Sequence, residues 1–144
     1  MKKVLLSAII FMIVLAGLLT GCSNNYCPED ETLASIEVFD ALLEKWDDGI
    51  NVAGRTARVS LPGPVSDLQE IKREVNAVEI TPCMEQAKKH LMKSLEYAIE
   101  GFMAFMGQED DAVVEMNFDL ATKYLDNYSN EIMKIFDCLP KCSE

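Results

Sequence analysis

The sequence contains a single histidine, His90, among its 144 residues. A di-iron site in a helical protein needs two Glu-x-x-His pairs, so one histidine excludes that site. Walker loops, dinucleotide-binding glycine motifs and hydrolase triads are also missing. His90 follows Lys88 and Lys89 on what reads as the polar side of a helix, and we expect it to be a solvated surface residue. The sequence therefore predicts no catalytic residues, no enzyme activity and no cofactor.

Basic residues are scarce. The chain has 13 lysines and arginines against 24 acidic residues, which gives a formal net charge of −11. Nucleic-acid-binding proteins need a cationic surface, so we expect no nucleic-acid partner. The same acidity disfavours a face that lies against anionic lipid head groups. Solubility of the domain is a sufficient explanation for this charge.

The longest uncharged apolar run stands near the amino terminus. It extends from Val4 to Leu19, after the positive residues Lys2 and Lys3. This run is shorter than the roughly 20 residues that a permanent membrane-spanning helix needs, and it is followed by small residues. The profile predicts a signal peptide over residues 1–21.

The residues that end this segment, Leu19-Thr20-Gly21-Cys22, resemble the lipobox of bacterial lipoproteins. The resemblance implies that Cys22 becomes the first residue of the mature protein and carries the lipid. Residues 22–27 are then a lipidated amino terminus and tether, and residues 28–144 are the domain. Two or three acyl chains hold a protein stably on a bilayer, whereas one chain holds it only marginally.

A lipid on Cys22 implies that the membrane is a partner and that the domain lies on the extracytoplasmic face of the cell membrane or outer envelope. Two alternatives stay open at this point. The protein is secreted after cleavage near Gly21 and Cys22 joins a disulfide, or the apolar run is an uncleaved membrane helix.

Helical periodicity covers most of the remaining chain, because apolar residues recur every three or four positions. The clearest stripe predicts a first helix that opens with the carboxylates of residues 29–31 and ends at Leu61-Pro62-Gly63-Pro64. The residues of that stripe are Ile36, Phe39, Leu43, Trp46, Ile50, Ala53 and Ala57.

Three further helices are predicted by the same period and by their end signals. A short second helix has Pro64 in its first turn, and a third extends from Thr81-Pro82 to Gly107. A fourth, capped by Asp110 or Asp111, ends near Asp137. Its predicted inward residues are Val113, Met116, Leu120, Tyr124, Tyr128, Ile132 and Ile135. The predicted fold is all-α, an up-down-up-down four-helix bundle with a short second helix.

Four cysteines follow Cys22, and the predicted topology places all of them at one end of the bundle. These residues are Cys27, Cys83, Cys138 and Cys142. Four thiols can pair in three ways, and an oxidising compartment makes pairing the default. The adjacency of the third and fourth helices favours Cys83 with Cys138 or Cys142, so residue position alone leaves the pairing open.

Several short motifs carry a second resemblance, over roughly Cys27 to Gln108. They include Trp46-Asp47-Asp48, Arg55-Thr56-Ala57-Arg58, Pro82-Cys83 and Gly101-Phe102-Met103-Ala104-Phe105-Met106. They resemble a family of small uncharacterised helical envelope proteins of bacteria that have one cysteine before the first helix and another in the Pro-Cys motif. This resemblance implies a Cys27–Cys83 disulfide, which leaves Cys138 and Cys142 to close a small loop. It implies no activity.

Two functions follow as expectations. The first is a non-catalytic module that binds an envelope protein or a small ligand outside the membrane. The alternative is a metal-handling or redox protein that uses Cys138 and Cys142 with Met103 and Met106 at the end of the third helix. Zinc sites favour pairs such as Cys-x2-Cys, and the only close pair here is Cys138-x3-Cys142, so we expect no metal site.

Arg55 and Arg58 form a candidate binding pair. They are two of only three arginines and stand three positions apart at the expected end of the first helix, where residues of that spacing are neighbours. Such a pair would grip an anion or an acidic partner at the membrane-distal tip. A simpler interpretation is that both arginines stabilise the negative carboxyl end of that helix.

Overall fold

The computed structural model describes residues 27–142, and these residues form four α-helices and two short 3-10 turns without any strand. The helices are α2 (Glu29–Arg55), α3 (Pro62–Ala77), α4 (Glu85–Gly107) and α5 (Asp111–Cys142). The turns are η1 (Arg58–Ser60) and η2 (Pro82–Met84). The all-α prediction is confirmed. The predicted signal peptide and Cys22 lie outside the described residues.

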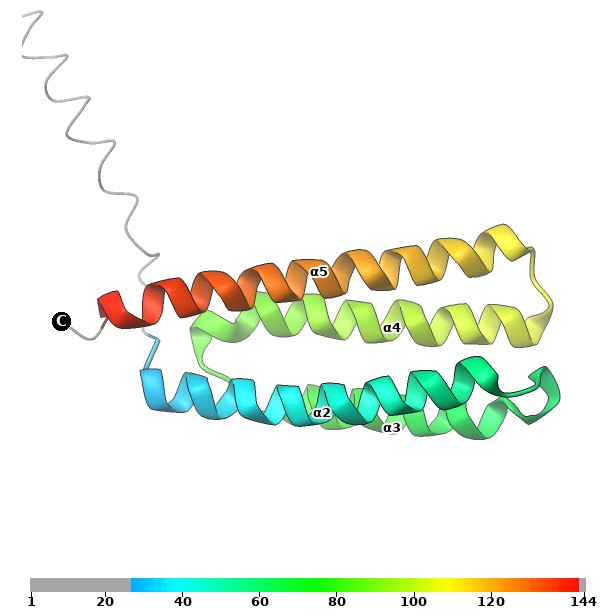
Figure 1. Ribbon diagram of the computed structural model, residues 1–144, viewed down its shortest axis with the longest axis horizontal. Helices are drawn as coiled ribbons and strands as arrows, with labels where there is room; N and C mark the ends of the chain where they lie inside the picture. Colours follow the sequence, from blue (N-terminus) through cyan, green and yellow to red (C-terminus); the bar gives the residue numbers. More distant parts are fainter. Residues whose placement is uncertain (1–26, 143–144) are drawn as a thin grey trace, which may run out of the picture.

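Consecutive helices run in opposite directions and form two hairpins that lie side by side (Figure 1). The first hairpin is α2 with α3, and the second is α4 with α5. The start of α2, the link from α3 to α4 and the end of α5 lie together at one end of the molecule. The α2–α3 and α4–α5 connections lie at the opposite end, which we call the tip (residues 56–61 and 107–110).

The first helix ends earlier than predicted. Helix α2 stops at Arg55, and the next residue, Thr56, has an extended backbone with φ −88° and ψ 133°. Leu61 follows η1 and is buried in the core, so the chain leaves the helix in order to insert this side chain. Ala57 is exposed and does not belong to the stripe. Helix α3 then starts at Pro62. Proline suits this position because the N–H groups of the first turn have no partner within the helix, so the missing N–H of proline costs nothing there.

The last helix is longer than predicted. Helix α5 passes Asp137 and Pro140 and ends at Cys142. A proline in a helix interior costs about 3 kcal/mol, because it has no N–H to donate to the carbonyl four residues earlier and its ring crowds that carbonyl. Pro140 stands in the last turn, so it affects only the end of α5. Burial of Leu139 offsets part of this cost. The predicted start is confirmed, since the N–H of Ala112 donates to Oδ1 of Asp110 over 2.9 Å.

The core contains most of the predicted stripes of α2, α3 and α4. Its largest fully buried side chains are Phe39, Leu61, Leu68, Met84, Leu91 and Leu95. Most of the stripe predicted for α5 also faces inward, since Tyr128 and Ile135 are buried and the other members except Met116 are half-buried. Met116 is exposed, whereas Asn117 and Ala121 are buried. Small side chains on the inner face of α5 let it lie close to α4, and the apolar period alone did not reveal that preference.

The contact between α4 and α5 is close because small residues line it. A Cβ added at Gly101 would lie 3.0 Å from Cζ of Phe118, so any larger residue would require the Phe118 ring to shift. The Ser94 hydroxyl donates to the carbonyl oxygen of Ala121 over 2.8 Å. Phe102 meets Phe118 edge to face, with ring centroids 5.1 Å apart. Within the described residues, no helix has the length and apolar character that a membrane span requires.

Candidate functional site: a cationic groove between α3 and α4

The Cys27–Cys83 disulfide is present. Its sulfur atoms are 2.09 Å apart, and it joins the residue before α2 to η2, so the predicted pairing is confirmed. We call this part of the molecule the disulfide end. The buried hydroxyls of Thr32 and Thr81 lie 3.1 Å from each other and contact the sulfur atoms. This bond ties the first hairpin to the start of the second.

Cys138 and Cys142 both lie within α5. The segment between them is a helical turn, so the predicted helix end near Asp137 is wrong. Cys138 is half-buried at the disulfide end. The side chain of Cys142 is outside the described part of the chain, so the pairing of Cys138 with Cys142 stays a prediction.

The methionines proposed as partners of these cysteines lie far away. Met103 and Met106 are in the last turns of α4 near the tip, whereas Cys138 is near the disulfide end. The length of α5 separates them by about 40 Å, at 1.5 Å per residue. These residues do not form one site. No group of three or more His, Cys, Asp or Glu side chains within residues 27–142 is arranged to hold a metal ion.

Arg55 and Arg58 are not neighbours on one helix, because α2 ends at Arg55 and Arg58 opens η1. The Arg58 guanidinium lies over the Phe105 ring, 4.3 Å from its centroid. This cation–π contact joins η1 to the last turn of α4. Arg58 therefore has a structural contact at the tip. The predicted alignment of the two arginines on one helix is wrong, whereas their binding of an anion or acidic partner stays a prediction.

His90 is half-buried, so the prediction of a solvated surface residue is wrong. Its ring stacks on Tyr124 with centroids 5.9 Å apart, and Tyr124 stacks on Tyr97 at 5.5 Å. The Lys93 ammonium donates to the Tyr124 hydroxyl over 3.3 Å. The buried Nδ1 of His90 has no hydrogen-bond partner among the described residues. The sequence pattern missed this arrangement because α5 covers a side of α4 that reads as polar.

Tyr128 is the second residue with an unsatisfied polar atom. Its ring is buried and meets Phe39 of α2 edge to face, with centroids 6.4 Å apart. Within the described part of the chain, its hydroxyl has no hydrogen-bond partner. Burial, followed by the nearby Asp40 carboxylate, raises the pKa of Tyr128 from 10.0 to about 12. The phenol is therefore neutral at physiological pH and serves packing.

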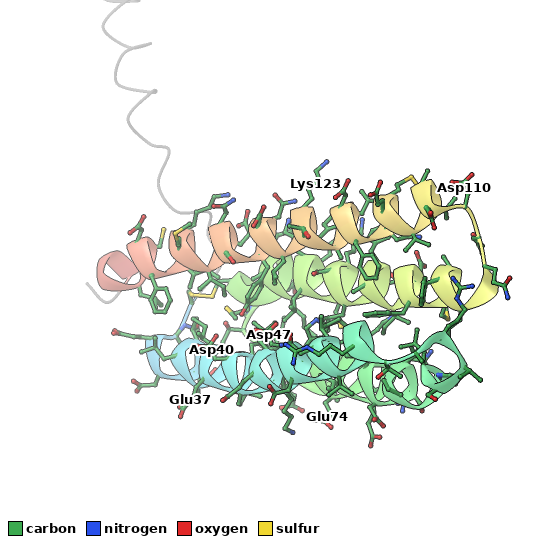
Figure 2. All side chains as sticks on the ribbon, turned by 45° about the vertical axis from the view of Figure 1, so that its right-hand side comes forward. Glu37, Asp40, Asp47, Glu74, Asp110 and Lys123 are labelled. Atoms are coloured by element: carbon green, nitrogen blue, oxygen red, sulfur yellow. A yellow bond between two sulfur atoms is a disulfide. The ribbon has the colours of Figure 1, made fainter. Side chains whose placement is uncertain are left out.

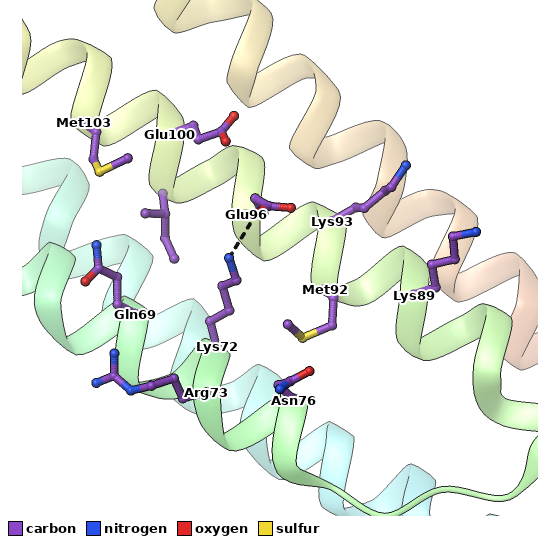
Figure 3. Close-up of a pocket in the computed structure, with 11 residues that line it drawn as sticks. Gln69, Lys72, Arg73, Asn76, Lys89, Met92, Lys93, Glu96, Glu100 and Met103 are labelled. Atoms are coloured by element: carbon purple, nitrogen blue, oxygen red, sulfur yellow. Dashed lines mark hydrogen bonds and ion pairs between the residues drawn. The ribbon is translucent and has the colours of Figure 1, made fainter.

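A groove of about 610 Å³ lies between α3 and α4, on the side of α4 away from its close contact with α5. Figure 3 shows Met92 and Met103 pointing from α4 toward α3, and Lys72 reaching from α3 toward Glu96. The Lys72 ammonium lies 3.3 Å from the Glu96 carboxylate. This ion pair joins the antiparallel helices α3 and α4 near the middle of the groove.

The groove carries more positive than negative charge. Four of the chain's 13 cationic residues line it, together with only two carboxylates, Glu96 and Glu100. Arg73 and Lys89 make no hydrogen bond or ion pair with any residue that the structure describes. Their charges have no protein partner among these residues, and the Lys89 side chain extends from α4 toward α5, so this charge lies at the rim of the groove (Figure 3). Lys88 is occupied, because its ammonium donates to the carbonyl oxygens of Asn76 and Val78 at the end of α3.

The floor of the groove is apolar. Met92, Ile99 and Met103 stand on α4 at intervals of seven and four residues, so they share one face of that helix. Ile99 is buried at the bottom, whereas the Met103 side chain is 44% exposed. Methionine is flexible and polarisable, and it adapts to partner surfaces of different shape.

The rest of the described surface has acidic character. Figure 2 shows carboxylates such as Glu37, Asp40 and Asp47 on α2 and Glu74 on α3. A positive groove on a protein of net charge −11 is a local reversal of charge. Solubility alone accounts for the acidic surface, but it does not account for this reversal.

Sequence reasoning missed this groove, although the chain contains a signal for it. Lys72-Arg73 and Lys88-Lys89, with Lys93, stand on either side of a short link between two helices. An antiparallel hairpin must bring such cations together. Each of these cations reads, within its own helix, as part of a polar face, so the helical period does not join them.

A second cavity of about 470 Å³ lies near the disulfide end, between the start of α2 and the segment before η2. Glu31 and Glu79 line it without any cationic side chain, so it shares the negative charge of the rest of the surface.

Comparison of the chain with protein-family models, with curated proteins and with solved structures finds no match.

Proposed function

We propose that this protein is a lipid-anchored interaction module of the bacterial cell envelope, and that the groove between α3 and α4 is its binding surface. The observation that carries the proposal is the local reversal of charge. Arg73 and Lys89 are unpaired within the described residues and flank an apolar floor on an otherwise acidic chain. Surfaces that combine apolar contacts with complementary charge are typical of binding sites.

In this proposal the scaffold is an up-down-up-down four-helix bundle, in which α3 is the short second helix. The scaffold is non-catalytic. Its role is to hold two antiparallel helices at a fixed spacing, so that side chains from both line one groove. The disulfide and the close α4–α5 contact keep α4 in place, which limits the entropy that the protein loses on binding.

The disulfide also supports the proposed location. Disulfides persist in oxidising compartments and are rare in the cytosol. The tether from Cys22 to Cys27 spans at most about 18 Å of extended chain. A lipid on Cys22 would therefore hold the disulfide end near the membrane and leave the groove accessible along the side of the domain.

Replacement of Cys22 by Ser tests the anchor. We expect the Cys22→Ser variant to lose incorporation of labelled fatty acid, and either to leave the membrane fraction or to accumulate as an uncleaved precursor. The matched control is Ser23→Ala, which keeps the cysteine and should remain lipidated. A cleaved Cys22→Ser protein that stays in the membrane fraction would contradict the anchor.

Cross-linking in native membranes tests the module. A photoreactive group in place of Met103, in the groove, should capture an envelope component, whereas the same group in place of Met133, on the exposed face of α5, should not. Equal capture from both positions, or none from Met103, would contradict the proposed binding surface.

A further inference from the structure

We infer that the groove between α3 and α4 binds an acidic amphipathic helix of a partner protein. The inference rests on the proposed interaction function and names the chemistry of the partner. It follows from the length of the groove, from the spacing of its apolar residues and from the position of its charges.

The dimensions of the groove suit a helix. On α4 its lining residues extend from Lys89 to Met103, which is about 21 Å at 1.5 Å per residue. A partner helix of about 14 residues has that length. Met92, Ile99 and Met103 stand seven and four residues apart, which is the spacing by which one helix meets another along a seam. The partner would present apolar residues at matching intervals of three or four.

The charges give the partner a direction. Lys89 and Lys93 lie in the half of α4 nearer the disulfide end, on the rim of the groove toward α5, where Lys93 also contacts Tyr124. Arg73 lies on α3 beside the central Lys72–Glu96 ion pair. Glu100 lies in the half nearer the tip. Acidic side chains of the partner are therefore favoured toward the disulfide end, and a neutral or basic one is favoured beside Glu100.

An anionic lipid surface fits the groove less well than an acidic helix does. Glu96 and Glu100 would lie against lipid phosphates, and a protein of net charge −11 is repelled by an anionic bilayer. A bilayer is also flat, whereas the apolar residues of the groove lie between two helices. A helix is narrow enough to enter the groove, and its sequence can place neutral or basic residues beside the two glutamates.

The test uses detergent-solubilised full-length protein and a labelled synthetic peptide of about 16 residues, with leucine on one helical face and glutamate on the other. Fluorescence anisotropy gives its affinity for the wild-type protein. We expect the double variant Arg73→Glu, Lys89→Glu to weaken binding at least about tenfold, because two attractions become repulsions. Both side chains are free of partners in the described structure, so the melting temperature should stay within a few degrees of the wild-type value.

The matched control is the double variant Lys123→Glu, Lys134→Glu, which makes the same change in net charge on exposed positions of α5. We expect it to weaken binding less than about twofold, since exposed charges at this distance are screened by salt. A peptide in which lysine replaces glutamate should not bind the wild-type protein. Equal weakening by both double variants, or failure of the acidic peptide to bind, would overturn the inference.

The same protein variants also test two other occupants of the groove, a lipid surface and a second copy of the chain. Binding of the full chain to vesicles of anionic phospholipid that is lost only in the groove variant would identify a lipid surface instead. A dimer that dissociates only in the groove variant would identify a second copy of the chain. Either result overturns the inference. If cross-linking at Met103 captures an envelope component but the acidic peptide does not bind, the proposed function stands and the helical partner is wrong.

Discussion

The two sides of α4 are built differently. On the side toward α5, glycine, serine and alanine let the helices approach, and a Cβ at Gly101 would already lie 3.0 Å from the Phe118 ring. On the side toward α3, long side chains meet instead, and Lys72 crosses the gap to reach Glu96. The first side leaves no room for a ligand. The second leaves a groove of about 610 Å³. Side-chain size along one helix therefore distinguishes the face that packs within the scaffold from the face that forms the proposed binding surface.

The difference has an energetic basis. Close-packed small residues maximise dispersion contacts and lose little side-chain entropy on folding. Lysine and methionine side chains lose more rotamer freedom when they are fixed, and an exposed ion pair contributes little in return. The long side chains that line the groove therefore add little to the stability that the buried core supplies. A partner helix that covers Met92 and Met103 would remove apolar surface from water, which is a gain that the isolated protein does not have.

The largest expected effect comes from filling the close-packed side. Gly101→Leu should destabilise the protein by about 3 kcal/mol, because its side chain enters the space of Phe118. The matched control is Gly54→Leu in α2, where an added Cβ has no neighbour within 4 Å among the described atoms. The control should be neutral or stabilising by up to about 1 kcal/mol, since leucine favours a helix more than glycine does. Chemical denaturation measures both, and equal values would contradict the difference in packing.

A smaller effect is expected where α5 meets α2. Tyr128→Phe should stabilise the protein by about 1 to 2 kcal/mol, because it removes a buried hydroxyl without a partner in the described structure. The gain should increase above pH 10. With a folded pKa of about 12 and an unfolded value near 10, the unfolded state ionises first, so wild-type stability falls as the pH rises from 10 to 12.

The Tyr128→Phe variant lacks the loss of stability that ionisation of Tyr128 causes between pH 10 and pH 12. Urea unfolding of both proteins at pH 8 and pH 11 measures it, with the other tyrosines common to both chains. A gain that is constant across these pH values would contradict the raised pKa, and a loss of stability would reveal an unseen partner for the hydroxyl.

The smallest effect is expected on the open side of α4. Lys72→Gln should destabilise the protein by less than about 0.5 kcal/mol, because the Glu96 side chain of this ion pair is 52% exposed. Glu96→Gln is the matched control, and the double variant isolates the coupling between the two residues. A coupling above about 1.5 kcal/mol in thermal unfolding would mean that this pair holds α3 to α4, contrary to the contrast between the two sides.

Much of the fold was predictable from local signals. Helix stripes, the Asp110 cap and the Gly107 end follow from apolar period and from chemistry within a few residues. The early end of α2 and the close approach of Ala121 to α4 were not, because the burial of Leu61 and of Ala121 depends on neighbours distant in sequence. Helix α5 also covers His90, which made a residue with polar neighbours half-buried.

The binding surface was predicted less well than the fold. The alignment of Arg55 with Arg58 on one helix was wrong because α2 ends between them, and binding by this pair stays a prediction. The groove was missed because its cations come from two helices, and only their antiparallel register brings Lys72 beside Glu96. Charges assigned to separate helices do not reveal a shared surface until the pairing of those helices is known.

Methyl NMR of the methionines tests the central claim most directly, because the chain carries its own controls. Met92 and Met103 lie in the groove, whereas Met116 and Met133 are 53% and 57% exposed on α5. On titration with the acidic amphipathic peptide, we predict saturable shifts of the Met92 and Met103 methyl signals, with those of Met116 and Met133 unchanged. Shifts confined to Met116 or Met133, or no shift at any of the four, would contradict the proposal that the α3 side of α4 is the binding surface.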